Sequence, residues 1–343
     1  MSPAPAADTL RRIARVVLLA LALALAPVPG SPTSPVAHAA DNGTWSVYPT
    51  PSKATDPASR TYFTLTSPPG ATLKDHVTIS NQSDHPITFK VYGADAYNTP
   101  RDGGFALRGT DEPQTDIGAW IKLDTTTVTV PAKKRTAIPF TLSIPANATP
   151  GDHSGAVVAL DPTVEGTQNH GAVTVGIKRA VGARLYLRVN GPTHPDLAIE
   201  NVRLDHDAPT LPWTRPSQAT LHYTLVNRGN TRLQPRLDLT ATNLLGHTTL
   251  HTQPRDLALT LLPGQRVELT EPWPNAPQLG RYTLTLRATT PDNGPQTTAR
   301  TTLTAIPWAA LTLLLTLITA ATTLPRVRRH LRTRRAQAQT QDG

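Results

Sequence analysis

The residues most suggestive of catalysis in this chain are Asp152, His153 and Ser154, which stand side by side between two glycines. They are the residue types of a hydrolytic triad, in which the histidine must lie in space between the other two. Three neighbours on an extended strand alternate between its faces and do not converge. The serine is also misplaced for a G-x-S-x-G turn. We therefore expect His153 to be a corner residue that bonds nearby backbone, and the sequence predicts no enzyme.

The other groups of candidate ligands are Asp205-His206-Asp207 and the pair His247 and His251. Aspartate and histidine in turns commonly bond their own backbone or face water. No second motif completes a coordination sphere, and no H-E-x-x-H, P-loop or dinucleotide fingerprint is present. The sequence predicts no metal and no cofactor.

The segment from Gly93 to Gly118 is the strongest candidate for binding a ligand, because it has no alternating strand pattern. We expect a long loop, and loops of this length in compact domains are usually functional or disordered. Its aromatic and basic side chains suit contact with glycan rings or a partner protein. The candidate ligand-binding residues are Tyr97, Arg101, Phe105 and Arg108. The alternative is a loop that packs its own aromatic side chains.

The elements that must position these residues are strands. Alternation of apolar and polar residues with a period of two dominates the chain between its termini, and turn residues interrupt it about every ten residues. The alternation is clearest over 77–79, 88–92, 136–142, 184–189, 220–226 and 282–286. No helical periodicity is sustained there. The sequence predicts an all-β region.

An internal repeat divides this region into two related parts. Residues 79–83 correspond to 225–229, each an apolar strand that runs into an Asn-centred turn. Residues 145–151 likewise correspond to 274–280, and each of these segments ends in a glycine before a strand. We expect the central Asn of each turn to be left-handed and each glycine to permit a tight turn. The fold class is therefore all-β, with two tandem immunoglobulin-like β-sandwiches.

Both ends of the chain carry targeting signals. Arg11, Arg12 and Arg15 precede an apolar run over 16–26 and a small-x-small site at 37–39, as in a secretory signal peptide. Near the other end, 306–324 has no charge and is long enough for a transmembrane helix. Arginines follow it and predict a cytoplasmic tail: Arg326, Arg328, Arg329, Arg332, Arg334 and Arg335.

The net charge of +9 lies mostly in these two flanks, and the region between them is close to neutral. The basicity therefore indicates topology and disfavours nucleic-acid binding. The absence of cysteine excludes disulfides. The expected order is a signal peptide (1–39), a first immunoglobulin-like domain (40–190), a second (191–305), a transmembrane helix (306–324) and a basic cytoplasmic tail (325–343).

The first of these domains resembles the N-terminal domain of the WxL-interacting protein family. The resemblance is carried by Trp45-Ser46-Val47-Tyr48-Pro49, Asn81, Ile117-Gly118-Ala119-Trp120-Ile121, and the segments 128–145, 151–160 and 184–189. It implies a signal peptide, two immunoglobulin-like domains, one transmembrane helix and a basic tail. It also implies peptidoglycan binding by the first domain and host or partner binding by the second.

These observations predict a non-enzymatic, single-pass type I protein of the cell membrane whose ectodomain lies outside the cell. It would bind peptidoglycan or other surface proteins of the envelope through its β-sandwiches. The alternative is a carbohydrate-binding or accessory subunit of a membrane transporter or hydrolase complex.

Overall fold

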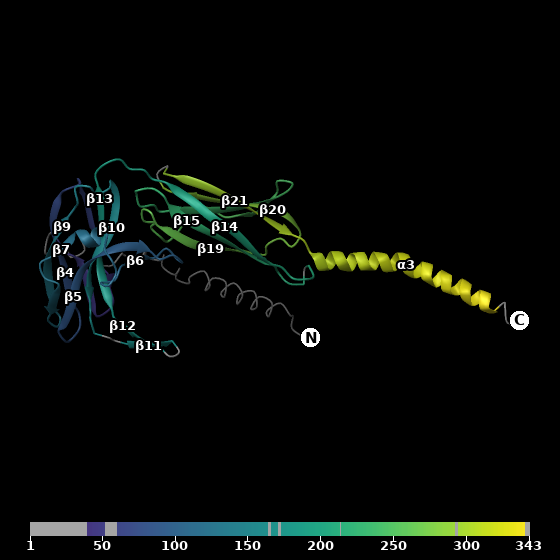
Figure 1. Cartoon of the computed structure of the whole chain (residues 1–343), viewed down its shortest axis with the longest axis horizontal. Helices are drawn as coiled ribbons and strands as arrows, with labels where there is room; N and C mark the ends of the chain where they lie inside the picture. The colour runs from purple at the N-terminus through teal and green to yellow at the C-terminus, as the bar shows by residue number, and fades with distance from the viewer. Residues whose placement is uncertain are drawn as a thin grey trace, which may run out of the picture. The chain divides into compact units, whose positions relative to one another are not determined.

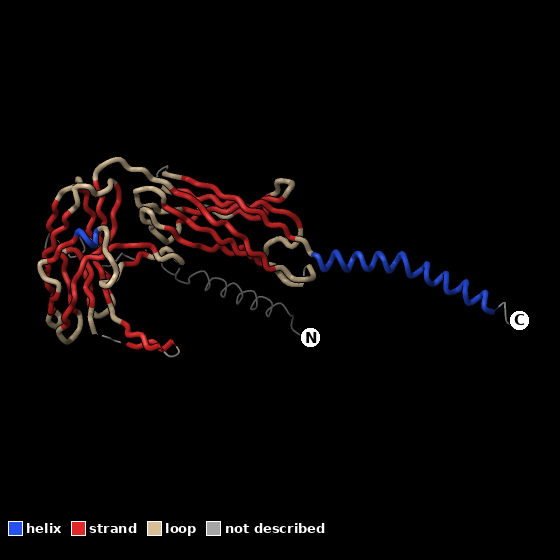
Figure 2. The backbone as a smooth tube through the Cα atoms, in the orientation of Figure 1, coloured by secondary structure: helices blue, strands red, loops and turns tan. Residues whose placement is uncertain are grey.

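The computed structural model describes residues 40–339, apart from 52–59, 164–165, 171–172, 213 and 292–293. The predicted signal peptide lies outside the described residues. Strands make up most of the described chain, and its helices are α2 (Ile117–Trp120) and α3 (Trp308–Gln339) (Figures 1 and 2). The prediction of an all-β fold is confirmed.

The first sandwich consists of two packed sheets. One has the strand order β1 (Ala40–Asp41), β2 (Trp45–Pro49), β4 (Thr72–Asn81), β9 (Arg135–Ser143), β7 (Ile121–Leu123). The other has the order β3 (Phe63–Ser67), β13 (Ala180–Val189), β10 (Gly151–Leu160), β5 (Ile87–Asn98), β6 (Phe105–Leu107), and β8 (Thr127–Val130) also pairs with β5. A separate hairpin is formed by β11 (Gly166–His170) and β12 (Val173–Ile177).

Alternating apolar side chains of both sheets fill the core of the first sandwich. The ring of Trp45 lies 5.2 Å from that of Phe89, and Phe63 meets Phe140 edge to face at the same distance. All four rings are buried. Burying such a side chain fully contributes about 1.5–3 kcal/mol, so these aromatic pairs are a main source of stability in a chain without disulfides.

The second sandwich has its own core and its own two sheets. Its three-stranded sheet has the order β14 (Leu197–Asp207), β15 (Gln218–Asn227), β19 (Arg266–Pro274). The other sheet has the order β17 (Thr248–His251), β16 (Arg236–Asn243), β20 (Gly280–Thr289), β21 (Gln296–Ala305), and β18 (Arg255–Asp256) also pairs with β16. Tyr223 and Trp273 are the largest side chains of this core. Every run of alternation named above falls within one of the strands of the two sandwiches.

The repeat has a structural basis in two asparagines. Asn81 donates its amide to the carbonyls of His85 and Val130, and its oxygen accepts the backbone N–H of Ser83. Asn227 makes the same three bonds in the second sandwich, to Thr231, Leu261 and Gly229. The prediction that these asparagines are left-handed is wrong, because neither has a positive φ. Their side chains, and not their backbones, hold the turns.

The glycines of the repeat have the expected geometry. Gly151 has a φ of +123° and Gly280 a φ of +111°, so both occupy the region that side-chain-bearing residues rarely adopt. His153 and Tyr282 occupy the same place two residues later. His153 Nε2 lies 2.8 Å from the carbonyl oxygen of Thr149, and the Tyr282 hydroxyl donates to the carbonyl of Leu279. The prediction of a backbone-bonded corner residue is confirmed.

The prediction of a loop over 93–118 is wrong at its start. Strand β5 continues through this stretch as far as Asn98, turns, and pairs with β6 as a hairpin. The alternation disappears because β5 is covered on both faces there, so that the neighbours Ala94 and Asp95 are both buried. A Cβ on Gly93 would lie 2.8 Å from the carbonyl oxygen of Gly118, which shows how closely the α2 turn approaches the strand.

The C-terminal helix α3 begins at Trp308, two residues after the predicted start of the span at 306, and extends beyond its predicted end. Its segment from Trp308 to Arg326 is long and apolar enough to cross a membrane, and none of it is buried inside the protein. Nineteen residues of helix cover roughly 28 Å, which is close to the hydrocarbon thickness of a bilayer. The helix does not end at Leu324 but continues through Pro325 to Gln339.

Candidate functional site

The hairpin of β5 and β6 places the four predicted binding residues in different surroundings. Cross-strand partners share a face, and Tyr97 pairs with Ala106 whereas Phe105 pairs with Asn98. Tyr97 and Phe105 therefore point to opposite faces of the hairpin. Arg101 is exposed at the tip, and Arg108 is near Glu112, with 3.5 Å between Nη1 and Oε2. The four side chains do not form one surface.

The tip of the hairpin contacts the second sandwich. The backbone N–H of Glu268 donates to the carbonyl of Pro100 at 2.6 Å. A Cβ on Gly103, which has a φ of +71°, would come within 2.8 Å of Leu259 Cδ2 and 3.2 Å of Val267 Cγ1. Glycine is therefore needed at position 103 for two reasons: it adopts the left-handed conformation, and it has no side chain to clash with the second sandwich.

Asn98 fixes this contact with the same set of bonds that Asn81 and Asn227 use inside each sandwich. Its amide donates to the carbonyls of Gly103 and Thr260, at 2.8 and 2.9 Å. Its oxygen accepts the N–H of Leu262 at 2.8 Å. Since the side chain is 3% exposed, these bonds form away from water and hold the hairpin against the second sandwich.

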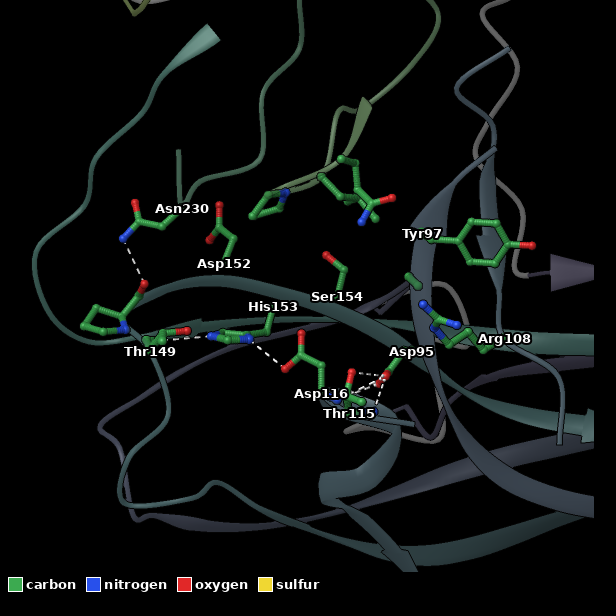
Figure 3. Close-up of a pocket in the computed structure, with 15 residues that line it drawn as sticks. Asp95, Tyr97, Arg108, Thr115, Asp116, Thr149, Asp152, His153, Ser154 and Asn230 are labelled. Atoms are coloured by element: carbon green, nitrogen blue, oxygen red, sulfur yellow. Dashed lines mark hydrogen bonds and ion pairs between the residues drawn. The ribbon is translucent and has the colours of Figure 1, made fainter. Parts of the chain in front are cut away.

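A polar pocket of about 240 Å³ lies beside this hairpin (Figure 3). Tyr97 and Arg108 line it on one side, and His153 and Ser154 of β10 line it on another. The buried carboxylate of Asp95 accepts the backbone N–H groups of Thr115, Asp116 and Gly118, and so holds the turn that begins α2. The carboxylate of Asp95 is therefore occupied by the protein itself.

His153 has an acceptor at each ring nitrogen. Nδ1 lies 2.7 Å from Oδ1 of Asp116, and Nε2 lies 2.8 Å from the carbonyl oxygen of Thr149 (Figure 3). Burial alone would lower the pKa of His153, but the hydrogen bond and charge of Asp116 outweigh it and raise the pKa above its ordinary value. The protonated ring satisfies both acceptors, so His153 acts as a cationic clamp between β10 and the α2 turn.

Asp152, His153 and Ser154 do not assemble a triad. Asp152 faces away from the histidine and makes a bidentate pair with Arg188, at 2.8 Å for both bonds. It also accepts the backbone N–H of Arg232 from the second sandwich at 2.8 Å. The Oγ of Ser154 is buried with no hydrogen-bond partner among the described residues, and both ring nitrogens of His153 bond other groups. The strand geometry separates them as the sequence predicts.

The surface on the other face of the hairpin carries a cluster of arginines and aromatic rings, which we call the aromatic–arginine groove. Its members are Tyr62, Phe105, Arg184, Tyr186, Arg188 and Arg232. Arg184 is central: its guanidinium lies 4.4 Å from the ring centre of Phe105 and 5.7 Å from that of Tyr62. Such cation–π contacts hold an arginine in place without neutralising it.

The rest of the groove is built around Tyr186. Its ring meets the rings of Tyr62 and Phe105 edge to face, with centroids 5.8 and 6.1 Å apart, and Arg232 lies 4.1 Å above it. Of the three arginines, Arg188 and Arg232 share the carboxylate of Asp152. Among the described residues, Arg184 forms no ion pair. The groove therefore has an excess of positive charge beside half-buried aromatic side chains.

Two hollows border this groove, of about 360 and 660 Å³. Both are lined by Arg184 and Tyr186 from the first sandwich and by Gln234 and Thr260 from the second. Cavities of this size accept ligands as large as a disaccharide or a short peptide. The polar pocket beside His153 is smaller, and most of its polar groups already have partners. We therefore regard the groove as the better candidate site.

Sequence reasoning identified one member of this groove, Phe105, and missed the rest. A signal for three of them was present, since Arg184, Tyr186 and Arg188 alternate with buried leucines and must share the outer face of β13. Nothing in the sequence places Tyr62 or Arg232 next to them. Among the described residues, no three His, Asp or Glu side chains gather in an arrangement that could hold a metal ion.

Comparison with known proteins finds a family match for most of the first sandwich. The family model described as "WxL Interacting Protein, peptidoglycan binding domain" matches residues 45–160. No curated protein matches the chain. Among solved structures, the class 5 fimbriae chaperone CfaA has a TM-score of 0.35 and 11% identity, over 69% of this chain and 95% of its own. The CupB2 chaperone of Pseudomonas aeruginosa has a TM-score of 0.27 and 9% identity, over 70% and 96%. At this level of similarity these structures say nothing of function. Residues 45–160 therefore match the peptidoglycan binding domain of the WxL interacting protein family.

Proposed function

We propose that this chain is a non-enzymatic protein of the cell surface that binds peptidoglycan through the aromatic–arginine groove. The description of the matching family supports the ligand class. The observation that carries the site is Arg184, a cation that is held by two aromatic rings and has no ion pair among the described residues. Arginine and tyrosine are the residues most enriched in binding hot spots.

The chemistry of the groove fits that of peptidoglycan. A glycan ring presents an apolar face that can pack against half-buried aromatic side chains such as those of Tyr62 and Tyr186. The peptide stems present carboxylates, which a planar guanidinium binds with two parallel hydrogen bonds. Because Arg184 is oriented before a ligand arrives, binding does not require the side chain to be ordered first.

We further propose that the chain is anchored by α3 in a single span, with the sandwiches outside the cell and the arginine-rich end inside. The length and apolar composition of Trp308–Arg326 support a span, and Arg326 begins the run of basic residues that stays in the cytoplasm. The groove would then face the wall that surrounds the membrane. The separation of Asp152, His153 and Ser154 supports a binding role over hydrolysis.

The test is cosedimentation of the detergent-solubilised full chain with purified, insoluble peptidoglycan, together with a melting temperature for each variant. Arg184→Gln keeps a polar side chain and removes the guanidinium group with its charge. We expect it to weaken retention about 30-fold, which corresponds to the ~2 kcal/mol of a hot-spot residue. Its melting temperature should change little, because Arg184 makes no side-chain hydrogen bond or ion pair with any residue that the structure describes.

Arg101→Ala is the matched control, since Arg101 is an exposed arginine on the same hairpin but outside the groove. We expect full retention from it. The prediction from sequence that Tyr97, Arg101 and Arg108 contact the ligand stays a prediction, and the same assay decides it. If Arg101→Ala loses retention and Arg184→Gln does not, the site is the hairpin tip and the groove is excluded.

A further inference from the structure

In the described part of the second sandwich, the exposed large apolar side chains are Leu211, Leu244, Leu245 and Leu279. Their exposed fractions are 45%, 78%, 82% and 57%. In the described part of the first sandwich no large apolar residue is comparably exposed. A single exposed leucine needs no explanation, but a group of them on one surface usually marks a contact with a partner or a membrane.

The strand register places three of these leucines near the end of β21. In the larger sheet Asn243 pairs with Tyr282, and Tyr282 pairs with Leu303. The turn that holds Leu244 and Leu245 starts directly after Asn243, so it projects beyond this row of residues. Leu279 immediately precedes Gly280, which pairs with Ala305 at the end of β21.

Leu211 lies at the same end of the other sheet. It is in the connection between β14 and β15, whose flanking residues Asp207 and Gln218 pair with each other. Gln218 also pairs with Pro274, the last residue of β19. From there residues 274–280 cross to the start of β20, and the side chain of Gln278 donates to the carbonyl of Arg215 in the Leu211 connection. The four leucines therefore belong to one end of the sandwich.

This is also the end at which the helix that is apolar enough to cross a membrane begins. Only Ile306 and Pro307 separate Ala305 from Trp308, the first residue of α3. Consecutive Cα atoms are 3.8 Å apart, so the start of α3 lies within about 11 Å of the end of β21. A bilayer that surrounds the helix must come close to the same end of the sandwich.

The leucine turn is held rigidly outward. The side-chain oxygen of Asn243 accepts the backbone N–H groups of Leu245 and His247, both at 2.9 Å. Gly246 closes the turn with a φ of +81°. Because the backbone is fixed in this way, Leu244 and Leu245 stay in contact with solvent although their burial would be favourable. This is expected if a lipid bilayer covers them.

We propose that this end of the second sandwich, formed by Leu211, Leu244, Leu245 and Leu279, is a membrane-contact surface. The leucines enter the boundary between headgroups and acyl chains, in the way that apolar faces of interfacial segments do. They hold the sandwich upright on the bilayer beside its own anchor. The inference rests on the proposed span of α3, which would bring the second sandwich close to the bilayer. It adds a contact between the leucines and lipid that the span alone does not require.

The chain lacks cysteine, so a single introduced thiol can be labelled uniquely. The full chain is inserted into phosphatidylcholine vesicles that contain nitroxide-labelled lipid, and an environment-sensitive fluorophore is attached to Leu244→Cys or Leu279→Cys. We expect both probes to be quenched by about twofold, as for side chains at the acyl boundary. Gln296→Cys, at the far end of β21 and roughly 30 Å away, should not be quenched.

Thr316→Cys in α3 separates the two proposals. If it is quenched while the probes at 244 and 279 are not, the span stands and the contact surface is refuted. If the probe at 316 is not quenched, the proposed span of α3 is refuted, and the proposed contact surface is refuted with it. A probe at 244 that becomes shielded from water without quenching by lipid would show that a protein, either a partner or a second copy, covers the surface instead.

Discussion

The substitution Asn98→Ala tests whether the hairpin joins the two sandwiches. It removes the bonds to the carbonyl of Thr260 and the N–H of Leu262, which cross between the sandwiches, and the bond to Gly103 within the hairpin. A buried backbone group left without a partner costs about 1–3 kcal/mol, so the two crossing bonds set a loss of roughly 2–6 kcal/mol. At about 2–4 °C per kcal/mol for a domain of 150–250 residues, the melting temperature should fall by roughly 4–24 °C.

Calorimetry of the full chain in detergent measures this loss, and amide hydrogen exchange locates it. The N–H of Leu262 should lose protection in Asn98→Ala. The matched control is Asn81→Ala, which removes the same kind of bonds inside the first sandwich and should expose the N–H of Ser83 instead. Unchanged exchange at Leu262 in Asn98→Ala, whatever the melting temperature, would refute the idea that this side chain couples the sandwiches.

Further predictions concern the pair of His153 with Asp116 and the turn at Gly151. Since the pKa of His153 is raised by Asp116, the stability from this pair is fully present below about pH 6.5 and is lost as the pH rises through the raised pKa. Urea unfolding across pH 5–9 should show this decline, and His153→Gln should abolish it; an equal slope in both proteins would contradict the clamp. Gly151→Ala should destabilise the chain by more than about 2 kcal/mol, because its Cβ would lie 2.2 Å from the carbonyl oxygen of Asn230. Gly246→Ala, where φ is also positive (+81°) but open space surrounds the site, should cost only about 1 kcal/mol, and equal losses would mean that the close approach to Asn230 does not matter.

The strands could be predicted because most of them have one buried face, as in β9, where Ile138, Phe140 and Leu142 alternate with more exposed residues. The end of β5 could not, because both of its faces are covered and the alternation is lost. The corner role of His153 followed from its place in the repeat, since Tyr282 stands at the same position.

The candidate site was harder to predict because its parts are distant in the sequence. The alternation of Arg184 and Tyr186 on β13 was visible, but Tyr62 and Arg232 reach them only through the parallel pairing of β3 with β13 and the contact between the sandwiches. Asn98 bonds residues more than 160 positions away, which no local pattern indicates.

The central claim, that the chain binds peptidoglycan without cleaving it, is tested most directly by a binding isotherm with purified insoluble peptidoglycan. The full chain is titrated onto the wall, soluble muropeptides are added as competitors, and the supernatant is assayed for released reducing ends and amino groups. We predict saturable retention that muropeptides displace, a right-shifted isotherm for Arg184→Gln, and no released product. Retention that muropeptides leave unchanged, or release of wall fragments that depends on the protein, would contradict this account.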